Sequence, residues 1–286
     1  MQLNKKSKIF IAGHNGMVGS SVMRHFKRKG YQNLFCKSRK SLNLIDQKKT
    51  YSYLKKIKPD FVIIAAAKVG GIFINKEEKA KFIYENIMIQ TNLIHSSFLT
   101  GVKKLIFLGS SCIYPKYSKQ PIKEEYLMTG KLEETNDAYA VAKLAGYKMC
   151  EAYNKQYKTN YICLMPTNLY GPNDNFDLET SHVLPAMIRK FHQAKVDNSP
   201  NVNLWGTGAP MREFLHVDDL ASAVAFSLKN EMNEHLYNIG SGHEISIVNL
   251  AEIIKQVVGY DGNILWDKSK PDGTPRKLLD ISKINK

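Results

Sequence analysis

Short apolar runs alternate with longer, helix-length stretches over the first 170 residues of the chain. The runs are continuously apolar, which is typical of strands that are buried on both faces of a parallel sheet. They lie at residues 8–12, 34–37, 61–66, 104–108 and 161–165, and the helix-length stretches lie at 17–29, 47–57, 79–99 and 138–156. This order predicts an α/β fold with a doubly wound parallel sheet.

The pattern loosens after about residue 172, where prolines separate shorter elements. Helices are still expected near residues 183–193, 218–228 and 246–258. We therefore divide the chain into a sheet domain at residues 1–171 and a smaller lobe at 172–286, with some segments of the lobe returning to the sheet. Ligands usually bind at such interfaces and at the carboxyl ends of parallel strands, so we expect a binding cleft between the two parts.

The composition is that of a globular protein. Hydrophobic residues make up 43% of the 286 positions and charged residues 23%, which excludes a disordered or collagen-like chain. The longest apolar run, at residues 61–67, is far shorter than the about 18 residues of a membrane span. The N-terminus shows no signal-peptide pattern, so a cytoplasmic location is expected. Four cysteines without metal-ligand spacing are interpreted as free thiols, and no metal is expected: Cys36, Cys112, Cys150 and Cys163.

The net charge of +15 is concentrated near the N-terminus, where the first 50 residues hold 12 Lys or Arg and one acid. A basic surface can bind nucleic acid, an anionic membrane or a phosphorylated small molecule. Lysine outnumbers arginine and no RNA-binding or helix-turn-helix pattern is present, so no nucleic-acid partner is expected. A solvated face of a lysine-rich chain is the plainer interpretation of the charge.

A glycine-rich turn follows the first predicted strand and opens the first predicted helix. Its glycines have the spacing GxxGxxG, whereas GxGxxG is more usual at a dinucleotide site. Such glycines allow a tight bend, a close approach of the backbone to a pyrophosphate, and close packing of helix on strand. We interpret the turn as a pyrophosphate site, although three glycines in seven residues also occur in plain turns. The residues assigned to the cofactor are Gly13, His14, Asn15, Gly16, Met17, Val18 and Gly19.

The neighbourhood of the second predicted strand indicates which dinucleotide binds. An acid at the end of this strand normally holds the adenine ribose 2′-hydroxyl when the cofactor is NAD. This chain has Lys37, Arg39 and Ser41 there and no acid. A cation beside a hydroxyl suits a 2′-phosphate, so NADP(H) is predicted as the cofactor, with Arg39 as a ligand. An ordinary basic turn is the alternative.

Tyr139 and Lys143 lie one turn apart on the same face of the predicted helix at 138–156. A nearby ammonium lowers the pKa of a tyrosine, which fits a tyrosine that donates a proton to a carbonyl reduced by hydride. Ser110, in the segment GSSCIYP after a predicted strand, could hydrogen-bond the same oxygen. A tyrosine and a lysine at this spacing are also common on surface helices, so the signal lies in the combination with a nucleotide-type fold.

Together these residues resemble the extended short-chain dehydrogenase/reductase family, which has a Rossmann-like fold, and within it the GDP-L-fucose synthase group. The matching stretches run from residue 12 to residue 280. GSSCIYP together with SHVLPA is the most specific pair, because most relatives lack this cysteine and this histidine. The other stretches include AGHNGMVGS, AAAKVGGI, NDAYAVAK, PTNLYGPNDNF, MREFLHVDDLA and KPDGTPRKLLD.

The resemblance implies two reactions in one site. GDP-4-keto-6-deoxy-D-mannose is epimerised at C3 and C5, and NADPH then reduces C4 to give GDP-L-fucose. Cys112 and His182 occupy the positions that the family uses for base and acid in the epimerisation. Both suit this chemistry, because surroundings tune a thiolate and histidine titrates near neutral pH. Spacing alone favours a buried small hydrophobe for Cys112 and a helix cap for His182.

The resemblance also implies binding residues one by one, while Asp218 in HVDD looks more like a helix N-cap than a catalyst. Plainer roles for these residues are a strand-to-loop turn, a core tryptophan, a surface arginine and a turn-forming acid. Lys190 stands where the family often has an arginine, and would bind phosphate as a point charge. The implied cofactor contacts are Leu108, Gly109, Ser110, Ser111, Lys143, Pro166, Thr167, Asn168, Leu169 and His182. The implied substrate contacts are Lys190, Trp205, Arg212 and Asp272.

Two other functions stay open at this point. One is a C4 reductase of a related GDP-4-keto sugar, such as a heptose, that omits one or both epimerisations. The other is a non-catalytic NADP-binding protein, against which the complete set of Ser110, Tyr139 and Lys143 argues. The family usually forms homodimers through two long helices of the first domain, and a homodimer through residues 79–99 and 138–156 is therefore expected.

Overall fold

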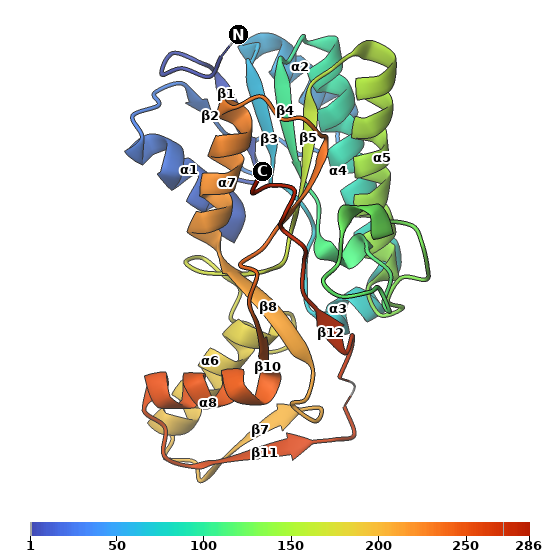
Figure 1. The fold of residues 1–286 in the computed structure, drawn as a ribbon. Coiled ribbons are helices and arrows are strands. Elements are labelled where there is room, and N and C mark those ends of the chain that lie inside the picture. The colour runs from blue at the N-terminus through green and yellow to red at the C-terminus, as the bar shows by residue number, and fades with distance from the viewer. Residues whose placement is uncertain (1, 271) are drawn as a thin grey trace.

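The computed structural model describes residues 2–270 and 272–286 and has a sheet domain with a smaller lobe below it (Figure 1). Six parallel strands form the central sheet in the order β2–β1–β3–β4–β5–β9. The predicted doubly wound parallel sheet is therefore confirmed. The strands are β1 (Ile9–Ala12), β2 (Leu34–Phe35), β3 (Phe61–Ile64), β4 (Lys104–Leu108), β5 (Tyr161–Pro166) and β9 (Leu236–Ile239).

Helices cover both faces of this sheet (Figure 1). On one face α1 packs beside α7, and on the other α5 packs on α4 and α4 packs on α2. In the described part of the chain, no helix is both long enough and apolar enough to cross a membrane. The bounds are α1 (Met17–Arg28), α2 (Gln47–Ile57), α4 (Lys79–Leu99), α5 (Asp137–Tyr157) and α7 (Val217–Lys229).

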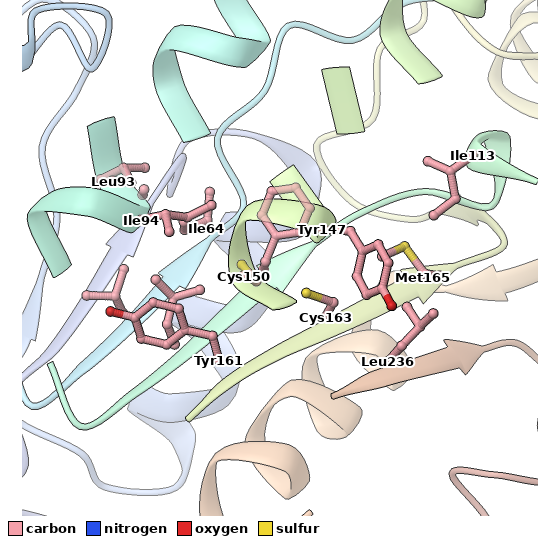
Figure 2. Close-up of a cluster of buried hydrophobic side chains, with 14 of the residues drawn as sticks. Ile64, Leu93, Ile94, Ile113, Tyr147, Cys150, Tyr161, Cys163, Met165 and Leu236 are labelled. Atoms are coloured by element: carbon pink, nitrogen blue, oxygen red, sulfur yellow. The ribbon is translucent and has the colours of Figure 1, made fainter. Parts of the chain in front are cut away.

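The strands are apolar on both sides because each side has its own layer of helices. In β1, Phe10 belongs to the cluster under α2, α4 and α5, whereas Ile9 and Ile11 belong to the cluster under α1 and α7. Figure 2 shows part of the first cluster, in which Cys150 of α5 and Cys163 of β5 lie among aliphatic and aromatic side chains. Both thiols are buried and free.

The C-terminal lobe has a hydrophobic core of its own. Phe191, Leu204 and Leu250 are buried together where α6 packs against α8 and β7. β7 pairs in parallel with β11. The bounds of these elements are α6 (Val183–Val196), β7 (Asn201–Trp205), α8 (Ile247–Val258) and β11 (Asn263–Asp267).

A small sheet joins the lobe to the sheet domain. Its central strand β8 (Met211–His216) pairs with β6 (Asn168–Tyr170), β10 (Glu244–Ser246) and β12 (Arg276–Lys277). Two elements beyond residue 172, α7 and β9, pack within the sheet domain. The lobe therefore sends segments back to the sheet, while the exact boundary at residues 171 and 172 stays a prediction.

Three short helical elements follow strands or loops and were not predicted: α3 (Ile72–Glu77), η1 (Ser111–Ile113) and η2 (Glu124–Tyr126). η1 begins directly after Ser110, whose hydroxyl accepts a hydrogen bond from the Cys112 N–H at 3.2 Å. This turn places both residues at the carboxyl end of β4, where ligands bind in open α/β sheets.

Candidate active site

Gly13 and Gly19 make the turn between β1 and α1 unusually tight. Gly13 has a φ of +88°, and a Cβ there would lie 2.6 Å from the Ala66 backbone nitrogen. A Cβ on Gly19 would lie 2.1 Å from the Gly13 carbonyl oxygen. α1 begins after Gly16, and the start of a helix offers free N–H groups and the positive end of its dipole to an anion. The turn therefore fits the pyrophosphate of a dinucleotide.

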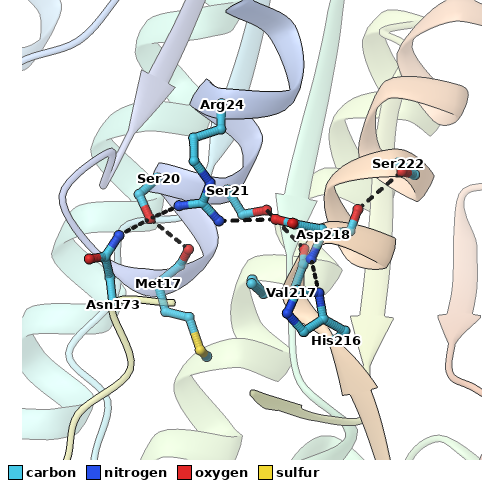
Figure 3. A network of polar contacts seen from close by, with 9 residues as sticks. All are labelled: Met17, Ser20, Ser21, Arg24, Asn173, His216, Val217, Asp218 and Ser222. Atoms are coloured by element: carbon cyan, nitrogen blue, oxygen red, sulfur yellow. Dashed lines mark hydrogen bonds and ion pairs between the residues drawn. The ribbon is translucent and has the colours of Figure 1, made fainter. Parts of the chain in front are cut away.

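Polar contacts fix α1 against the start of α7 (Figure 3). The Ser21 hydroxyl donates to the Val217 carbonyl at 3.2 Å and to the Asp218 carboxylate, which also pairs with Arg24 at 3.0 Å. The N-cap of α7 is His216, whose Nδ1 accepts from the Asp218 N–H at 3.2 Å. The expectation that Asp218 is the N-cap is therefore wrong. Its carboxylate instead holds the helix that follows the glycine turn.

Arg39 follows β2 and forms an ion pair with Glu85 of α4, with Nη2 and Oε2 3.3 Å apart. The Arg39 side chain is 72% exposed and that of Glu85 is 8% exposed. Sequence reasoning found no acid near this strand end, because α4 brings Glu85 there from a distant part of the chain. Most of the Arg39 side chain is accessible from solvent, so it can still receive a phosphate.

Ser110, Tyr139 and Lys143 are brought together at the junction of β4 and α5. The Lys143 ammonium donates to the Leu108 carbonyl at 2.8 Å and lies 5.9 Å from the centroid of the Tyr139 ring. It also lies 5.0 Å from the Phe107 ring centroid, and the residue is buried. The structure thus places the predicted reductase residues next to one another.

The pKa of Tyr139 differs from the value below normal that its neighbour Lys143 led us to expect. Burial raises the pKa of Tyr139, Cys112 acts in the same direction, and a hydrogen bond with Ser110 opposes both. Burial lowers the pKa of Lys143 to about 8. The expected lowering of the tyrosine pKa by Lys143 is therefore wrong for this geometry, in which the ammonium is directed to the Leu108 carbonyl. A tyrosine that stays protonated still suits a proton donor.

Cys112 is only partly buried, which does not fit a small hydrophobe in the core. Its sulfur accepts hydrogen bonds from Asn136 Nδ2 and from Lys277 Nζ, each at 3.5 Å. Asn136 is the N-cap residue of α5 and Lys277 lies in β12. The thiol therefore has an amide donor and an ammonium as neighbours, an environment typical of reactive cysteines.

His182 occupies the N-cap position of α6 but makes no capping hydrogen bond through its side chain. The residue is exposed, and partial desolvation by surrounding protein together with the Lys277 cation lowers the pKa of its imidazole. The preceding loop packs on the sheet domain, where the Gly71 N–H donates to the Thr180 carbonyl at 2.8 Å. A Cβ on Gly71 would lie 2.4 Å from the Ser181 carbonyl oxygen. This close approach holds His182 at the interface of lobe and sheet domain.

The segment from Pro166 to Leu169 lies at the end of β5 and in β6. The Thr167 hydroxyl and the Asn168 side-chain amide both donate to the Glu213 carbonyl, at 3.2 and 2.8 Å. The segment is thus fixed to β8 by its own side chains. Its contact with a nicotinamide stays a prediction, as do the contacts of the β4 end.

Lys190 and Trp205 lie together on the lobe. The Lys190 ammonium donates to the Asn203 carbonyl at 2.8 Å and lies 5.8 Å from the Trp205 ring centroid, with Lys270 5.5 Å from the same ring. Trp205 is 52% exposed, so it is not a core tryptophan. An exposed aromatic ring with two ammonium groups near it suits a nucleotide base and its phosphates.

The Asp272 carboxylate is bonded to the loop at Thr207. Its two carboxylate oxygens accept from the Thr207 N–H and hydroxyl, both at 2.8 Å. Arg212 donates to the Asp272 carbonyl at 3.3 Å and to the Met211 carbonyl at 2.8 Å. The Asp272 carboxylate thus bonds a loop 65 residues away in the sequence and does not form a turn of its own, and its contact with a nucleotide stays a prediction.

Sequence reasoning missed Lys277, Asn136 and Glu213, although each lies inside a motif that was singled out. Glu213 gave only a weak signal, because its strand mixes charged and apolar residues, yet the structure buries it completely. Asn136 stands three residues before Tyr139 and so could have been examined as its neighbour. For Lys277 no local signal exists, because its partner Cys112 is 165 residues away.

Comparisons with known proteins show the family to which the chain belongs. The profile of the NAD dependent epimerase/dehydratase family matches residues 9–240. GDP-L-fucose synthase 1 of Arabidopsis thaliana is 55% identical over 281 residues, which cover 98% of this chain and 87% of that protein. GDP-L-fucose synthase of Escherichia coli strain K12 is 50% identical over 290 residues, which cover 98% and 90%.

A solved structure of a relative has the same fold. MlghC, a GDP-mannoheptose C4 reductase from Campylobacter jejuni with NADP bound, superposes with a TM-score of 0.91 at 40% identity. The superposition covers 99% of this chain and 92% of that chain. The chain therefore belongs to the NAD dependent epimerase/dehydratase family, and within it to the GDP-L-fucose synthase group.

Proposed function

We propose that this chain converts GDP-4-keto-6-deoxy-D-mannose to GDP-L-fucose, by epimerisation at C3 and C5 and NADPH-dependent reduction at C4. The observation that carries the proposal is the meeting of two sets of groups at the end of β4. One set is Tyr139 with Ser110 and Lys143, and the other is Cys112 with its polar partners. Identity of 50% and 55% to GDP-L-fucose synthases over nearly the whole chain supports the same substrate.

NADP(H) is the cofactor, and NADPH supplies the hydride that reaches C4 when it is bound. Gly13 and Gly19 leave no room for a Cβ, and the bare backbone of the turn can approach a pyrophosphate. Arg39 offers an exposed guanidinium to the 2′-phosphate. The NADP-bound relative of similar fold supports this choice.

Reduction of C4 needs a proton for the carbonyl oxygen. Tyr139 holds its proton because burial raises its pKa, and it gives that proton up as negative charge develops on the oxygen. Ser110 shares the same oxygen through a hydrogen bond and so stabilises the developing charge. Lys143 keeps α5 and the end of β4 at a fixed spacing.

Epimerisation acts on C3 and C5, which both flank the C4 carbonyl. Removal of a proton from either carbon leaves an enolate, with the electron pair delocalised onto the C4 oxygen. Cys112 takes this proton on one face of the sugar, and His182 returns a proton on the opposite face. The reductase hydroxyls at the C4 oxygen stabilise the enolate as well, so the two reactions share one site.

The direct test is to incubate the purified chain with GDP-4-keto-6-deoxy-D-mannose and NADPH in heavy water. We expect oxidation of NADPH and, by NMR, GDP-L-fucose that carries deuterium at C3 and C5. Repeating the reaction with NADH in place of NADPH is the cofactor control. Absence of NADPH oxidation with this substrate would refute the proposal.

A second candidate is C4 reduction without epimerisation, on a related GDP-4-keto sugar such as a heptose. It is favoured by the likeness to MlghC, a GDP-mannoheptose C4 reductase, at 40% identity. In that case the product keeps the configuration of the substrate at C3 and C5 and acquires no deuterium there. The ratio of kcat/KM for the heptose and the 6-deoxyhexose then decides the substrate.

The active form is a homodimer in this proposal, with α4 and α5 packed on the same helices of a second copy. These helices carry apolar side chains that are exposed in the single chain. We expect light scattering to give twice the mass of 32.5 kDa, and a monomer at enzyme-assay concentration would contradict it. The cytoplasmic location stays a prediction. The exposed side chains are Tyr84 and Leu99 of α4 and Val141 and Tyr157 of α5.

A further inference from the structure

Lys277 lies beside the Cys112 sulfur although 165 residues separate them in the sequence. Its ammonium donates to the sulfur at 3.5 Å, and the side-chain amide of Asn136 donates at the same distance. The three side chains line one pocket together with Thr274. An ammonium and an amide donor both favour a negatively charged sulfur over a neutral one.

No carboxylate in the described ranges 2–270 and 272–286 forms an ion pair with Lys277. Glu133 lines the same pocket, but it pairs with Lys116 at 3.5 Å and accepts from the Thr135 N–H at 2.9 Å. The positive charge of Lys277 therefore acts on Cys112 without an acid in contact to neutralise it.

The backbone around Lys277 is anchored on both sides. Arg276 pairs with Glu244 at 2.6 Å, and the N–H of Leu279 donates to the fully buried Glu213 carboxylate at 3.0 Å. β12 also pairs in parallel with β8. Because the strand is already fixed, little backbone entropy is lost in holding the lysine beside the sulfur.

Other charged and titratable groups act on this pair. Tyr139 and Arg212 interact electrostatically with Cys112, and His182 interacts with Lys277. Tyr139 keeps its proton because burial raises its pKa. Arg212 is a second cation, besides Lys277, that interacts with Cys112. The cation of Lys277 also disfavours a protonated His182. Lys277 therefore interacts both with Cys112, the proposed base, and with His182, the proposed acid.

We propose that Lys277 is a positioning residue for the epimerisation, in which its ammonium holds the Cys112 sulfur as the thiolate that removes the C3 and C5 protons. This inference rests on the proposed function. In each removal a C–H bond breaks, an S–H bond forms, and the electron pair moves onto the C4 oxygen. Before the second removal the sulfur gives its proton to solvent and His182 takes a proton from solvent, which restores both groups. Lys277 keeps its proton throughout. Reduction of C4 draws its proton from Tyr139 and does not use the charge of Lys277.

The first test measures the sulfur directly and needs no substrate. Iodoacetamide is applied across a range of pH, and mass spectrometry follows the peptide that contains Cys112. We expect Lys277→Met to slow alkylation of Cys112 at neutral pH about tenfold and to move its pH profile upward, because the ammonium no longer favours the thiolate. Lys277→Arg should restore most of the rate, and Lys119→Met, which removes an exposed lysine outside this pocket and leaves Glu133 paired with Lys116, should change little. An unchanged profile in Lys277→Met would overturn the proposal.

The second test separates the two reactions. Deuterium uptake at C3 and C5 reports epimerisation, and oxidation of GDP-L-fucose by NADP⁺ reports hydride transfer alone. We expect Lys277→Met to slow the uptake about tenfold while kcat and KM for the oxidation stay within about twofold. A raised KM with both reactions slowed alike would overturn the proposal, because Lys277 would then only bind substrate. Thermal unfolding of Lys277→Met and Lys277→Arg monitors folding of both variants.

The two hypotheses fail in different ways. If the unaltered protein takes up no deuterium at C3 or C5, the proposed function fails, and so does a role for Lys277 in epimerisation. If the protein takes up deuterium but alkylation of Cys112 does not depend on Lys277, the proposed function stands and the role of Lys277 is rejected.

Discussion

The Lys143 ammonium donates a hydrogen bond to the Leu108 carbonyl at 2.8 Å and so ties α5 to the last residue of β4. Tyr139 lies one turn before Lys143, and Ser110 lies two residues after Leu108. The hydrogen bond therefore fixes the spacing between the two hydroxyl groups that face the reacting carbonyl in the proposed mechanism. Lys143 therefore links α5 to β4 as well as carrying a charge.

Tyr139→Phe should abolish most of the reduction while leaving the binding of NADPH unchanged. The substitution removes only the hydroxyl, and the loss of a positioned proton donor costs about 10²- to 10⁴-fold in rate. Steady-state turnover measures the loss, and titration of protein fluorescence with NADPH measures binding. Turnover near that of the unaltered protein would remove Tyr139 as the proton donor.

The burial of Lys143 should make stability depend on pH above about 8. Burial lowers the pKa of this lysine from 10.5 to about 8, so the unfolded chain keeps its proton over a pH range in which the native protein releases it. Unfolding then binds a proton, and native stability rises with pH between these two values. Below pH 8 the cost of burying the charge is present in full.

Comparison with Lys143→Met isolates this effect, because other titrating groups are common to both proteins. Between pH 8 and pH 10.5 the free energy of unfolding of the unaltered protein should increase, relative to that of Lys143→Met, by on the order of 3 kcal/mol. Urea unfolding at several pH values measures the difference. A constant difference across this range would show that Lys143 is not desolvated as described.

Gly19→Ala should destabilise the protein, whereas Gly16→Ala should not. A Cβ at Gly19 would lie 2.1 Å from the Gly13 carbonyl oxygen, but at Gly16 the nearest atom is the same oxygen at 3.6 Å, an ordinary contact. Overpacking of this kind costs about 1–3 kcal/mol. Urea unfolding of both variants at one pH tests the contrast. Equal stability of the two would mean that the turn relaxes to accept a side chain.

Most of the sheet domain follows from the sequence, but its sixth strand, β9, does not. The strand is short, and Asn238 interrupts its apolar pattern. In the structure Asn238 is fully buried: its oxygen accepts from the Tyr114 hydroxyl at 2.6 Å, and its amide donates to the Ile122 carbonyl at 2.9 Å. Those partners lie more than 100 residues away. A polar residue satisfied by such distant groups cannot be recognised as part of a core strand from its neighbours.

The candidate site also contains some residues that the sequence predicts and others that it does not. Residues that lie in local motifs, such as Tyr139 with Lys143 or the glycines of the first turn, could be identified because spacing along one helix or turn sets their geometry. The partners of Arg39 and Cys112 could not, because Glu85 and Lys277 reach them only through tertiary packing. The prediction for the Tyr139 pKa was wrong for the same reason, since it counted a sequence neighbour and not burial.

Arg39→Ala should weaken NADPH binding far more than NADH binding. A hydrogen bond to a charged group is worth about 1.5–3 kcal/mol, which corresponds to roughly tenfold to 100-fold in affinity. The variant also leaves Glu85 buried without its ion-pair partner, so it should lose stability. The double variant Arg39→Ala with Glu85→Gln should recover stability but not the preference for NADPH. Equal kcat/KM for the two cofactors in the unaltered protein would contradict the role of Arg39.

Cys112→Ser should separate the two proposed reactions. Serine is close in size to cysteine and keeps a hydrogen-bonding group next to Asn136 and Lys277. Its hydroxyl is far less acidic than a thiol, however, so it stays neutral, and a neutral hydroxyl is a poor base for a carbon-bound proton. Deuterium uptake at C3 and C5 in heavy water should therefore fall by about 10²-fold or more.

Hydride transfer to C4 depends on Tyr139 and not directly on Cys112, so Cys112→Ser should still oxidise NADPH. Its product should be the C4-reduced sugar with the starting configuration at C3 and C5, formed slowly because the unepimerised sugar fits the reductase groups less well. NMR identifies this stereoisomer and locates any deuterium. Uptake of deuterium at the rate of the unaltered protein would show that Cys112 is not the base, and the base would then have to be sought among the other groups around the pocket.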